Sequence, residues 1–200
     1  IRDSARKGAY KKRKMPEKQP VEFGDCVTAD RLISRSAEAK GINGETNAFV
    51  IGDRATEWIF GFPVKSRDAD DTYKCLVDFL GPGLPIRFLW TDCSEELELA
   101  AKQLGVPHGL GTPGIKTTNC YGEAYVKMIM RGTRTYLGQA GLPHCYWPYA
   151  MKAFSFSRIT KRRPKNESIW ERRHKDGPFP GHFQPFGCLV YSDHLQEVLF

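Results

Sequence analysis

Three acidic residues stand where separate secondary-structure elements are predicted to begin or end. Asp30 follows the strand-like segment V-T-A, Asp92 follows F-L-W-T, and Glu123 falls in the first turn of a predicted helix. Carboxylates gathered from separate elements suit the binding of two divalent cations, because the cations offset the repulsion between the acids. Such cations activate a water or hydroxyl group for in-line phosphoryl transfer. The three residues are therefore candidates for a metal-dependent phosphoryl-transfer site.

Spacing alone leaves this assignment open. Each of the three acids could instead be an ordinary surface residue, and Asp25, Asp53 and Glu95 compete for the same role. The six cysteines include no C-x-x-C pair and no zinc-ligand spacing with histidine, so we expect free thiols in a reducing compartment. The sequence suggests no Ser-His-Asp or Cys-His arrangement for nucleophilic catalysis.

Hydrophobic periodicity predicts the elements that would position these acids. Residues 21–33 are expected to form a strand that runs into a polar loop. Further apolar runs predict strands at 47–52, 57–64, 85–91, 106–111 and 186–191, with the first two of these joined as a hairpin. Helical spacing and capping signals predict helices at 68–80, between Ser94 and Gly105, at 121–140, from Pro143 to about Arg158, and at 167–176. A hairpin followed by alternating strands and helices indicates an α/β domain with a mixed sheet.

The predicted helix 121–140 has two different faces. At 100° per residue, one carboxylate and three cations fall within about 80° of arc, namely Glu123, Lys127, Arg131 and Arg134. Apolar side chains such as Ile129 fall on the far side. We expect the apolar face to pack on the sheet, and the charged face either to contact phosphates or to be an ordinary solvated surface.

The positive charge of the chain is concentrated in two segments. The formal net charge is +7, with eight Lys or Arg against two acids in residues 1–20 and nine against two in residues 152–175. Residues 21–151 are net acidic. Two basic arms around an acidic core suit an enzyme that holds a polyanion, and two solvated linkers are the alternative. The run Lys11-Lys12-Arg13-Lys14 is typical of a nuclear localisation signal or a phosphate-contacting arm.

Composition narrows the class of protein. With 40% hydrophobic and 26% charged residues, the chain is expected to fold. No apolar run approaches the roughly 18 residues of a membrane span, so we expect no membrane partner. Because the sequence begins at Ile1 rather than methionine, we expect a fragment or processed piece of a longer protein.

Short motifs follow one another in a specific order. They read G-D-C-V-T-A-D at 24–30, D-R-A-T-E-W at 53–58, T-D-C-S-E-E-L at 91–97, T-P-G-I-K-T-T-N-C-Y-G-E at 112–123, Y-W-P-Y-A at 146–150, N-E-S-I-W-E at 166–171 and F-G-C-L-V-Y at 186–191. Each motif is weak alone, and the ordered series is specific. Over about residues 21–191 the sequence resembles the integrase core of copia-type long-terminal-repeat retrotransposons, within the retroviral integrase and ribonuclease H-like superfamily.

This resemblance implies a fold and a division of the chain. It implies an α/β, ribonuclease H-like fold with a mixed five-stranded sheet and helices on both faces. The implied segments are a basic linker at 1–20, the catalytic core at 21–160, and a basic C-terminal extension at 161–200 that carries the W-E and F-G-C-L-V-Y motifs. The last two acids are 31 residues apart, a little closer than in retroviral enzymes.

The resemblance also implies an activity and its residues. It implies DNA integration, with 3′-end processing followed by strand transfer, in the nucleus after a cytoplasmic stage. Asp30, Asp92 and Glu123 match the catalytic Asp-Asp-Glu triad that binds Mg²⁺ or Mn²⁺. The implied partners are element-end DNA, target DNA and further copies of the same chain. The candidate nucleic-acid contacts are Lys116, Asn119, Lys127 and Arg131, of which Asn119 could instead cap a helix.

Several positions depart from the family pattern around the triad. Cys93 replaces an expected Asn, Cys120 an expected Gly, and Ala124 an expected Arg, while Ile115 and Lys116 stand where Arg and Pro are usual. Losing a glycine removes backbone freedom from a loop expected to close on DNA. An inactive nucleic-acid-binding remnant is therefore the second hypothesis. A ribonuclease H-type nuclease is the third, disfavoured because the C-terminal motifs belong to integrase polyproteins.

Overall fold

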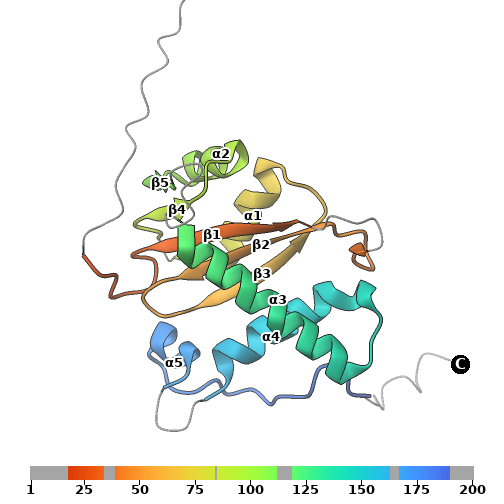
Figure 1. Cartoon of the computed structure of the whole chain (residues 1–200). Coiled ribbons are helices and arrows are strands. Elements are labelled where there is room, and N and C mark those ends of the chain that lie inside the picture. The colour runs from red at the N-terminus through yellow and green to blue at the C-terminus, as the bar shows by residue number, and fades with distance from the viewer. Residues whose placement is uncertain (1–17, 34–38, 84, 112–118, 163–166, 190–200) are drawn as a thin grey trace, which may run out of the picture.

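Five strands form one mixed sheet in the computed structural model, which describes residues 18–33, 39–83, 85–111, 119–162 and 167–189 (Figure 1). The strands are β1 (Val27–Ile33), β2 (Asn47–Asp53), β3 (Ile59–Val64), β4 (Leu89–Thr91) and β5 (His108–Leu110), in the order β3-β2-β1-β4-β5. β2 pairs antiparallel with β1 and β3, whereas β1–β4 and β4–β5 are parallel. The predicted hairpin and the predicted mixed five-stranded sheet are confirmed.

The helices begin and end where local chemistry allows it. They are α1 (Ala69–Leu80), α2 (Glu95–Leu104), α3 (Cys120–Ala140), the 3₁₀ helix η3 (His144–Tyr146), α4 (Trp147–Thr160) and α5 (Ile169–His174). Asp68 caps α1 by accepting a hydrogen bond from the backbone N–H of Asp71 at 2.7 Å. α2 ends at Gly105 in the left-handed conformation, with φ of 67°, which glycine adopts without steric cost.

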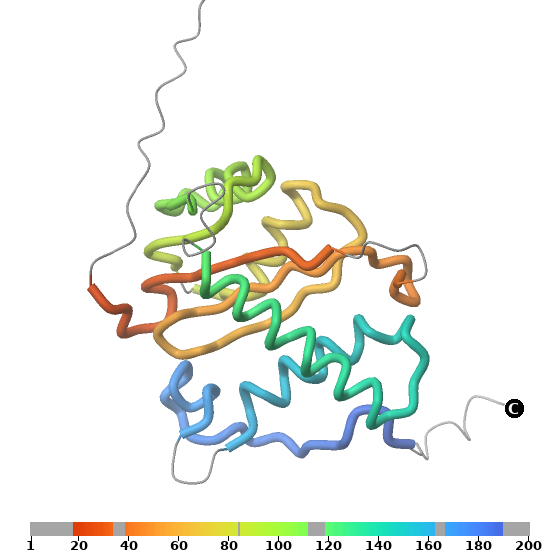
Figure 2. Tube along the Cα trace, in the orientation of Figure 1, coloured from red at the N-terminus to blue at the C-terminus, as the bar shows by residue number. Residues whose placement is uncertain are grey.

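Helices cover both faces of the sheet, α1 and α2 on one side and α3 and α4 on the other (Figures 1 and 2). Side chains alternate along β2, and they join two different hydrophobic clusters. Phe49 and Ile51 pack with apolar residues of α1 and α2. Ala48 and Val50 pack with Ile129 of α3 and its neighbours on α4. The predicted two-faced coverage is confirmed, and β2 is buried along its whole length.

The short helix α5 packs against the same core as the sheet. A capping box at Ser168 and Glu171 starts the helix, and Ile169 lies in the cluster that contains Phe49 and Ile51. Arg173 lies 4.0 Å from the ring centroid of Phe23 and 4.1 Å from that of Trp58, and it donates a hydrogen bond of 2.6 Å to the backbone oxygen of Leu80. The predicted division of the chain at residue 160 stays a prediction, and α5 beyond it is part of the packed fold.

The predicted strand at 186–191 is wrong over its described part. Residues 186–189 form a turn without strand pairing, in which the N–H of Cys188 donates to the backbone oxygen of Pro185. Gly187 takes a φ of 80°, which is incompatible with an extended strand. The ring of Phe186 stacks on Tyr136 of α3 instead. Within the part of the chain that the structure describes, no helix has the length and apolar character needed to cross a membrane.

The packing of α5 predicts a large and local stability effect. Ile169 is 1% exposed, so Ile169→Ala should lower the free energy of unfolding by about 2–5 kcal/mol through lost burial and the cavity left behind. Leu99 on α2 is 53% exposed, and Leu99→Ala serves as the matched control with a change below about 0.5 kcal/mol. Urea denaturation followed by circular dichroism measures both. Equal effects of the two substitutions would contradict the packing of α5 described above.

Candidate active site

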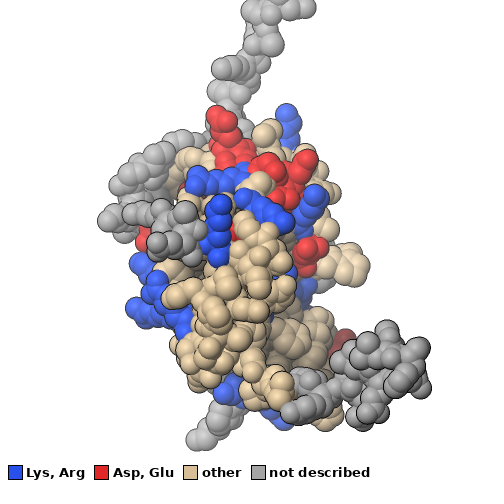
Figure 3. All heavy atoms as spheres, turned by 90° about the vertical axis from the view of Figure 1, so that its right-hand side faces the viewer, with Lys and Arg blue, Asp and Glu red and all other residues tan. Residues whose placement is uncertain are grey.

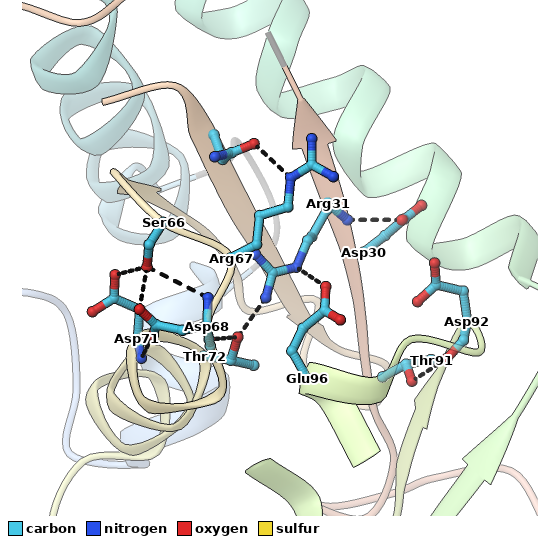
Figure 4. Close-up of polar contacts among 11 residues, drawn as sticks. Asp30, Arg31, Ser66, Arg67, Asp68, Asp71, Thr72, Thr91, Asp92 and Glu96 are labelled. Atoms are coloured by element: carbon cyan, nitrogen blue, oxygen red, sulfur yellow. Dashed lines mark hydrogen bonds and ion pairs between the residues drawn. The ribbon is translucent and has the colours of Figure 1, made fainter. Parts of the chain in front are cut away.

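The pairing of two parallel strands aligns Asp30 with Asp92. Val27 pairs with Leu89 and Thr28 with Trp90 across β1 and β4. Continuing this register by two residues brings Asp30 opposite Asp92, and neighbouring strands lie only about 4.8 Å apart. The two carboxyl groups emerge on the same face, beside α3 (Figure 4). The two aspartates that the sequence analysis singled out are thus brought together by the sheet itself.

The third acid approaches the pair from α3. Tyr125 packs against Gly52 of β2, where a side chain on residue 52 would clash with the phenol ring. Ile129, one turn further, lies in the cluster with Val50 and contacts β3 near Gly61. These contacts hold the first helical turn, and therefore Glu123, over the sheet beside β1. The Nζ of Lys127 lies 3.6 Å from the Glu123 carboxylate.

The pKa of Asp30 is affected by both of the other acids. Burial raises the pKa of Asp30 to about 6, and the nearby carboxylates of Asp92 and Glu123 add to this increase, while the hydrogen bond from the N–H of Arg31 opposes it. The pKa of Asp92 is also raised, by partial desolvation and by Glu96, while Arg31 counters the shift. A bound divalent cation would offset the repulsion among these carboxylates.

Arg31 lies on the opposite face of β1 from Asp30, where it helps to hold the loop that carries Asp92 (Figure 4). Its guanidinium contacts the Glu96 carboxylate at 3.3 Å and donates a hydrogen bond to the hydroxyl of Thr72. The Arg31 side chain is only 9% exposed, so solvent screens this ion pair weakly. Glu96 sits in the first turn of α2, just beyond the loop that carries Asp92. The pair therefore ties the Asp92 loop to the residue that follows Asp30.

A buried histidine holds the backbone of Asp92. The hydroxyl of Thr91 donates to the backbone oxygen of Asp92 at 2.8 Å and lies 2.7 Å from Nε2 of His108. Because the single hydroxyl proton goes to Asp92, Nε2 of His108 must be the donor to Thr91. Burial lowers the pKa of His108 to about 4, so the ring stays neutral at physiological pH. His108 lies in β5, and nothing in its sequence spacing pointed to this role.

The competing acids have other tasks. Asp25 accepts hydrogen bonds from the N–H groups of Val21 and Glu22 and pairs with Arg87 at 2.7 Å. Asp53 is buried and accepts from Thr56 and from the N–H of Gly24, which stabilises the turn between β2 and β3. Glu95 is exposed in the first turn of α2. These hydrogen bonds and the ion pair show that Asp25 and Asp53 have structural roles.

The carboxylates do not form a closed coordination shell. Among the described residues, no group of three or more His, Cys, Asp or Glu side chains is arranged to hold a metal ion. One oxygen of Asp30 accepts from the N–H of Arg31, and Glu123 faces Lys127. The donor set nonetheless fits a hard divalent cation, because it consists of carboxylate oxygens, and Asp92 and Glu123 both add to the burial-raised pKa of Asp30.

Three of the four predicted nucleic-acid contacts lie on α3 or at its N-terminal end. Lys127 and Arg131 are exposed on its outer face, as the sequence predicted. Asn119 is the N-cap residue of α3, but its side chain makes no capping hydrogen bond, and its buried Oδ1 has no partner among the described residues. The simple capping role is therefore wrong for this side chain. Lys116 lies outside the described residues.

The C-terminal basic segment is partly used for packing. Arg158 donates to the backbone oxygen of Glu57 at 2.8 Å, and Arg172 pairs with the Glu57 carboxylate at 3.1 Å. With Arg173 stacked on the core, three of the cations counted in residues 152–175 have structural roles, which the charge count could not reveal. On the face visible in Figure 3, basic and acidic side chains are mixed in the upper part, a largely uncharged area lies below them, and further basic side chains lie at the left edge and the lower end.

Comparison with known proteins supports the fold. No protein-family model and no curated protein matches this sequence. The structure is similar to a chain of the simian T-cell lymphotropic virus intasome in complex with the PP2A regulatory subunit B56 gamma, solved by cryo-electron microscopy, with a TM-score of 0.62 and 16% sequence identity. The similarity covers 85% of this chain and 63% of that chain, so this chain spans less than two thirds of the other. The mixed sheet and its helices have the integrase or ribonuclease H-like arrangement.

The raised pKa of Asp30 predicts a pH-dependent stability. The folded protein retains the Asp30 proton up to about pH 6, whereas the unfolded chain releases it near the ordinary value of 3.8. Between these values the folded state binds more protons, so stability falls as pH rises, and the full penalty remains above pH 6. Without metal, Asp30→Asn should be more stable than wild type at about pH 7.5, by about 1–3 kcal/mol, and similar to it near pH 4.

Urea denaturation in the presence of EDTA measures this difference. Asp78→Asn is the matched control, because Asp78 is exposed on α1, and it should change stability little at either pH. A loss of stability in Asp30→Asn of the same size at both pH values would show that Asp30 carries no electrostatic penalty.

Proposed function

We propose that this chain is the metal-dependent polynucleotidyl transferase core of a copia-type retrotransposon integrase. The observation that carries the proposal is the placement of three carboxylates by β1, the end of β4 and the first turn of α3, near enough that Asp92 and Glu123 add to the raised pKa of Asp30. The fold supports the proposal because it is shared with a chain of a retroviral intasome. The proposed ligands are Asp30, Asp92 and Glu123.

Mg²⁺ or Mn²⁺ bound by these carboxylates would supply Lewis-acid activation of the attacking oxygen and charge neutralisation at the phosphate. Asp30 is mostly ionised at neutral pH, because its pKa is about 6, and so is available as a ligand. Arg31 with Glu96, and Thr91 with His108, hold the two aspartates in place. In the proposed reaction, water first cleaves a phosphodiester near the DNA end and frees a 3′-hydroxyl. That hydroxyl then attacks a target phosphodiester, forming one P–O bond as another breaks.

The proposed partners follow from the same reaction. DNA ends and target DNA would run over α3, where Lys127 and Arg131 are exposed, with Asn119 at the start of the helix. The intasome that contains the similar chain is an assembly, which supports a homo-oligomer here. Integration would take place in the nucleus.

A second candidate is a nucleic-acid-binding remnant with weak or no catalysis. Glu123 faces Lys127 at 3.6 Å, which offsets its negative charge within α3 itself. Cys120 and Ala124 flank the same turn in place of the Gly and Arg usual in the family. Since positioning supplies much of the barrier reduction in phosphoryl transfer, small displacements can cost about a hundredfold in rate.

Metal binding should be visible as a stability gain. Ligand binding to the folded state alone raises the unfolding temperature, so millimolar Mg²⁺ or Mn²⁺ should shift the thermal melt of the wild type upward. Asp92→Asn removes one ligand and should abolish the shift. Glu95→Gln removes an exposed acid of α2 and should leave the shift intact. The absence of a shift in the wild type would count against a metal site.

Activity is tested by Mn²⁺-dependent nicking of supercoiled plasmid and joining of a labelled oligonucleotide to it. We expect slow nicking by the wild type, a drop of at least about a hundredfold in Glu123→Gln, and no loss in Glu95→Gln. The double variant Cys120→Gly with Ala124→Arg should join more than either single variant. Metal and DNA binding with no nicking by wild type or double variant would favour the remnant. Nicking that survives in Glu123→Gln would rule out the proposed triad.

A further inference from the structure

An arginine supports one face of an exposed tyrosine beside the carboxylates. The guanidinium carbon of Arg54 lies 3.9 Å from the ring centroid of Tyr121. The turn that follows β2 places Arg54, whose N–H donates to the backbone oxygen of Cys26 at 3.0 Å and whose side chain contacts the Cys26 thiol at 3.9 Å. Arg54 is thus held by Cys26, next to the start of β1, and its guanidinium lies against the ring of Tyr121.

Tyr121 shares the first turn of α3 with Glu123. Two residues at 100° each place these side chains on opposite sides of the helix. Glu123 is close enough to Asp30 to raise its pKa and pairs with Lys127, whereas Tyr121 lies against Arg54 in the turn after β2. A helix with its side chains is about 10–12 Å across. One or two nucleotides of a strand can therefore span the distance from Glu123 to Tyr121. A nucleic-acid strand bound at the carboxylates and crossing the start of α3 would next meet Tyr121.

Tyr121 is exposed, and it is not the residue that packs the first turns of α3 on the sheet. Tyr125, one turn later, provides the contact with the sheet and is 8% exposed, whereas Tyr121 is 44% exposed. The two rings are tilted at 58° with centroids 6.4 Å apart, so Tyr125 does not stack face to face on Tyr121. One face is therefore occupied by a cation, and the exposed fraction of the side chain leaves the ring accessible to a ligand.

The cation also sets the chemistry of the open face. A guanidinium under an aromatic ring draws electron density toward itself, which makes the far face less electron-rich. Such a face stacks best on an electron-rich aromatic group, and among nucleobases the purines present the larger and more electron-rich surface. Stacking of a base on an aromatic side chain is worth about 1–3 kcal/mol, which corresponds to about 5-fold to 150-fold in affinity.

We propose that Tyr121, supported by Arg54, is a stacking site for an unpaired nucleobase next to the reacting phosphate, with a preference for purines. The site rests on the proposed function for its ligand class, because a nucleic-acid strand at the carboxylates brings the base within reach. It gives the chain a base-selective contact at a frayed DNA end, in addition to the phosphate contacts of α3.

The test measures binding without catalysis. Fluorescence anisotropy in EDTA gives the affinity for duplexes with a short single-stranded end that carries adenine, cytosine or an abasic residue at one position. The wild type should bind the adenine end at least about fivefold more tightly than the abasic end, with cytosine between them. Tyr121→Phe keeps the ring and should retain this preference. Tyr121→Ser should lose it while overall binding persists.

Tyr149→Ser is the matched control, because Tyr149 is 48% exposed on α4, away from the carboxylates. It should keep the adenine preference. A wild type without preference, or a Tyr121→Ser variant that keeps it, would overturn the proposal. Because no metal is present, the result is independent of nicking. If the adenine preference depends on Tyr121 but the protein never nicks DNA, the stacking site is supported. The transferase function is then rejected.

Discussion

The parallel pairing of β1 with β4 is the constraint on which the candidate site depends. Its register sets Asp30 beside Asp92, and the alternation of β1 sends Asp30 toward α3 and Arg31 toward α2. A slip of one residue would exchange these two side chains, placing a cation among the carboxylates and burying an acid between helices. The antiparallel pairing with β2, buried along its whole length, holds this register from the other side.

Bringing three acids together carries an electrostatic cost, which the packing of the chain offsets. Tyr125 against Gly52, and Ile129 against Val50, keep α3 over the sheet despite the repulsion at its first turn. The Arg31–Glu96 pair places a nearly buried cation one residue from Asp30. This arrangement explains why the site belongs to the folded domain as a whole: the strands supply two acids, and α3, which packs across them, supplies the third.

Much of this architecture could be predicted because it depends on local periodicity. Alternation and helical spacing predicted the five strands and five helices. Asp92 follows β4 as predicted, whereas Asp30, predicted at a strand end, lies in the middle of β1. Features set by distant contacts could not be predicted in this way. Arg158, Arg172 and Arg173 were counted as a basic arm, although they pack on Glu57 and on aromatic rings. The apolar run at 186–191 suggested a strand, but Gly187 turns the chain onto α3. No spacing rule marks Arg31 or His108.

The most direct measurement is the position of a bound ion in crystals of the protein soaked with Mn²⁺. Anomalous scattering locates manganese without any assumption about activity. The convergence of β1, β4 and α3 predicts at least one peak bound by carboxylate oxygens of Asp30 and Asp92, with Glu123 turned from Lys127 toward it. Peaks confined to other acids, or none beside Asp30 at saturating Mn²⁺, would contradict the existence of a metal-dependent site here.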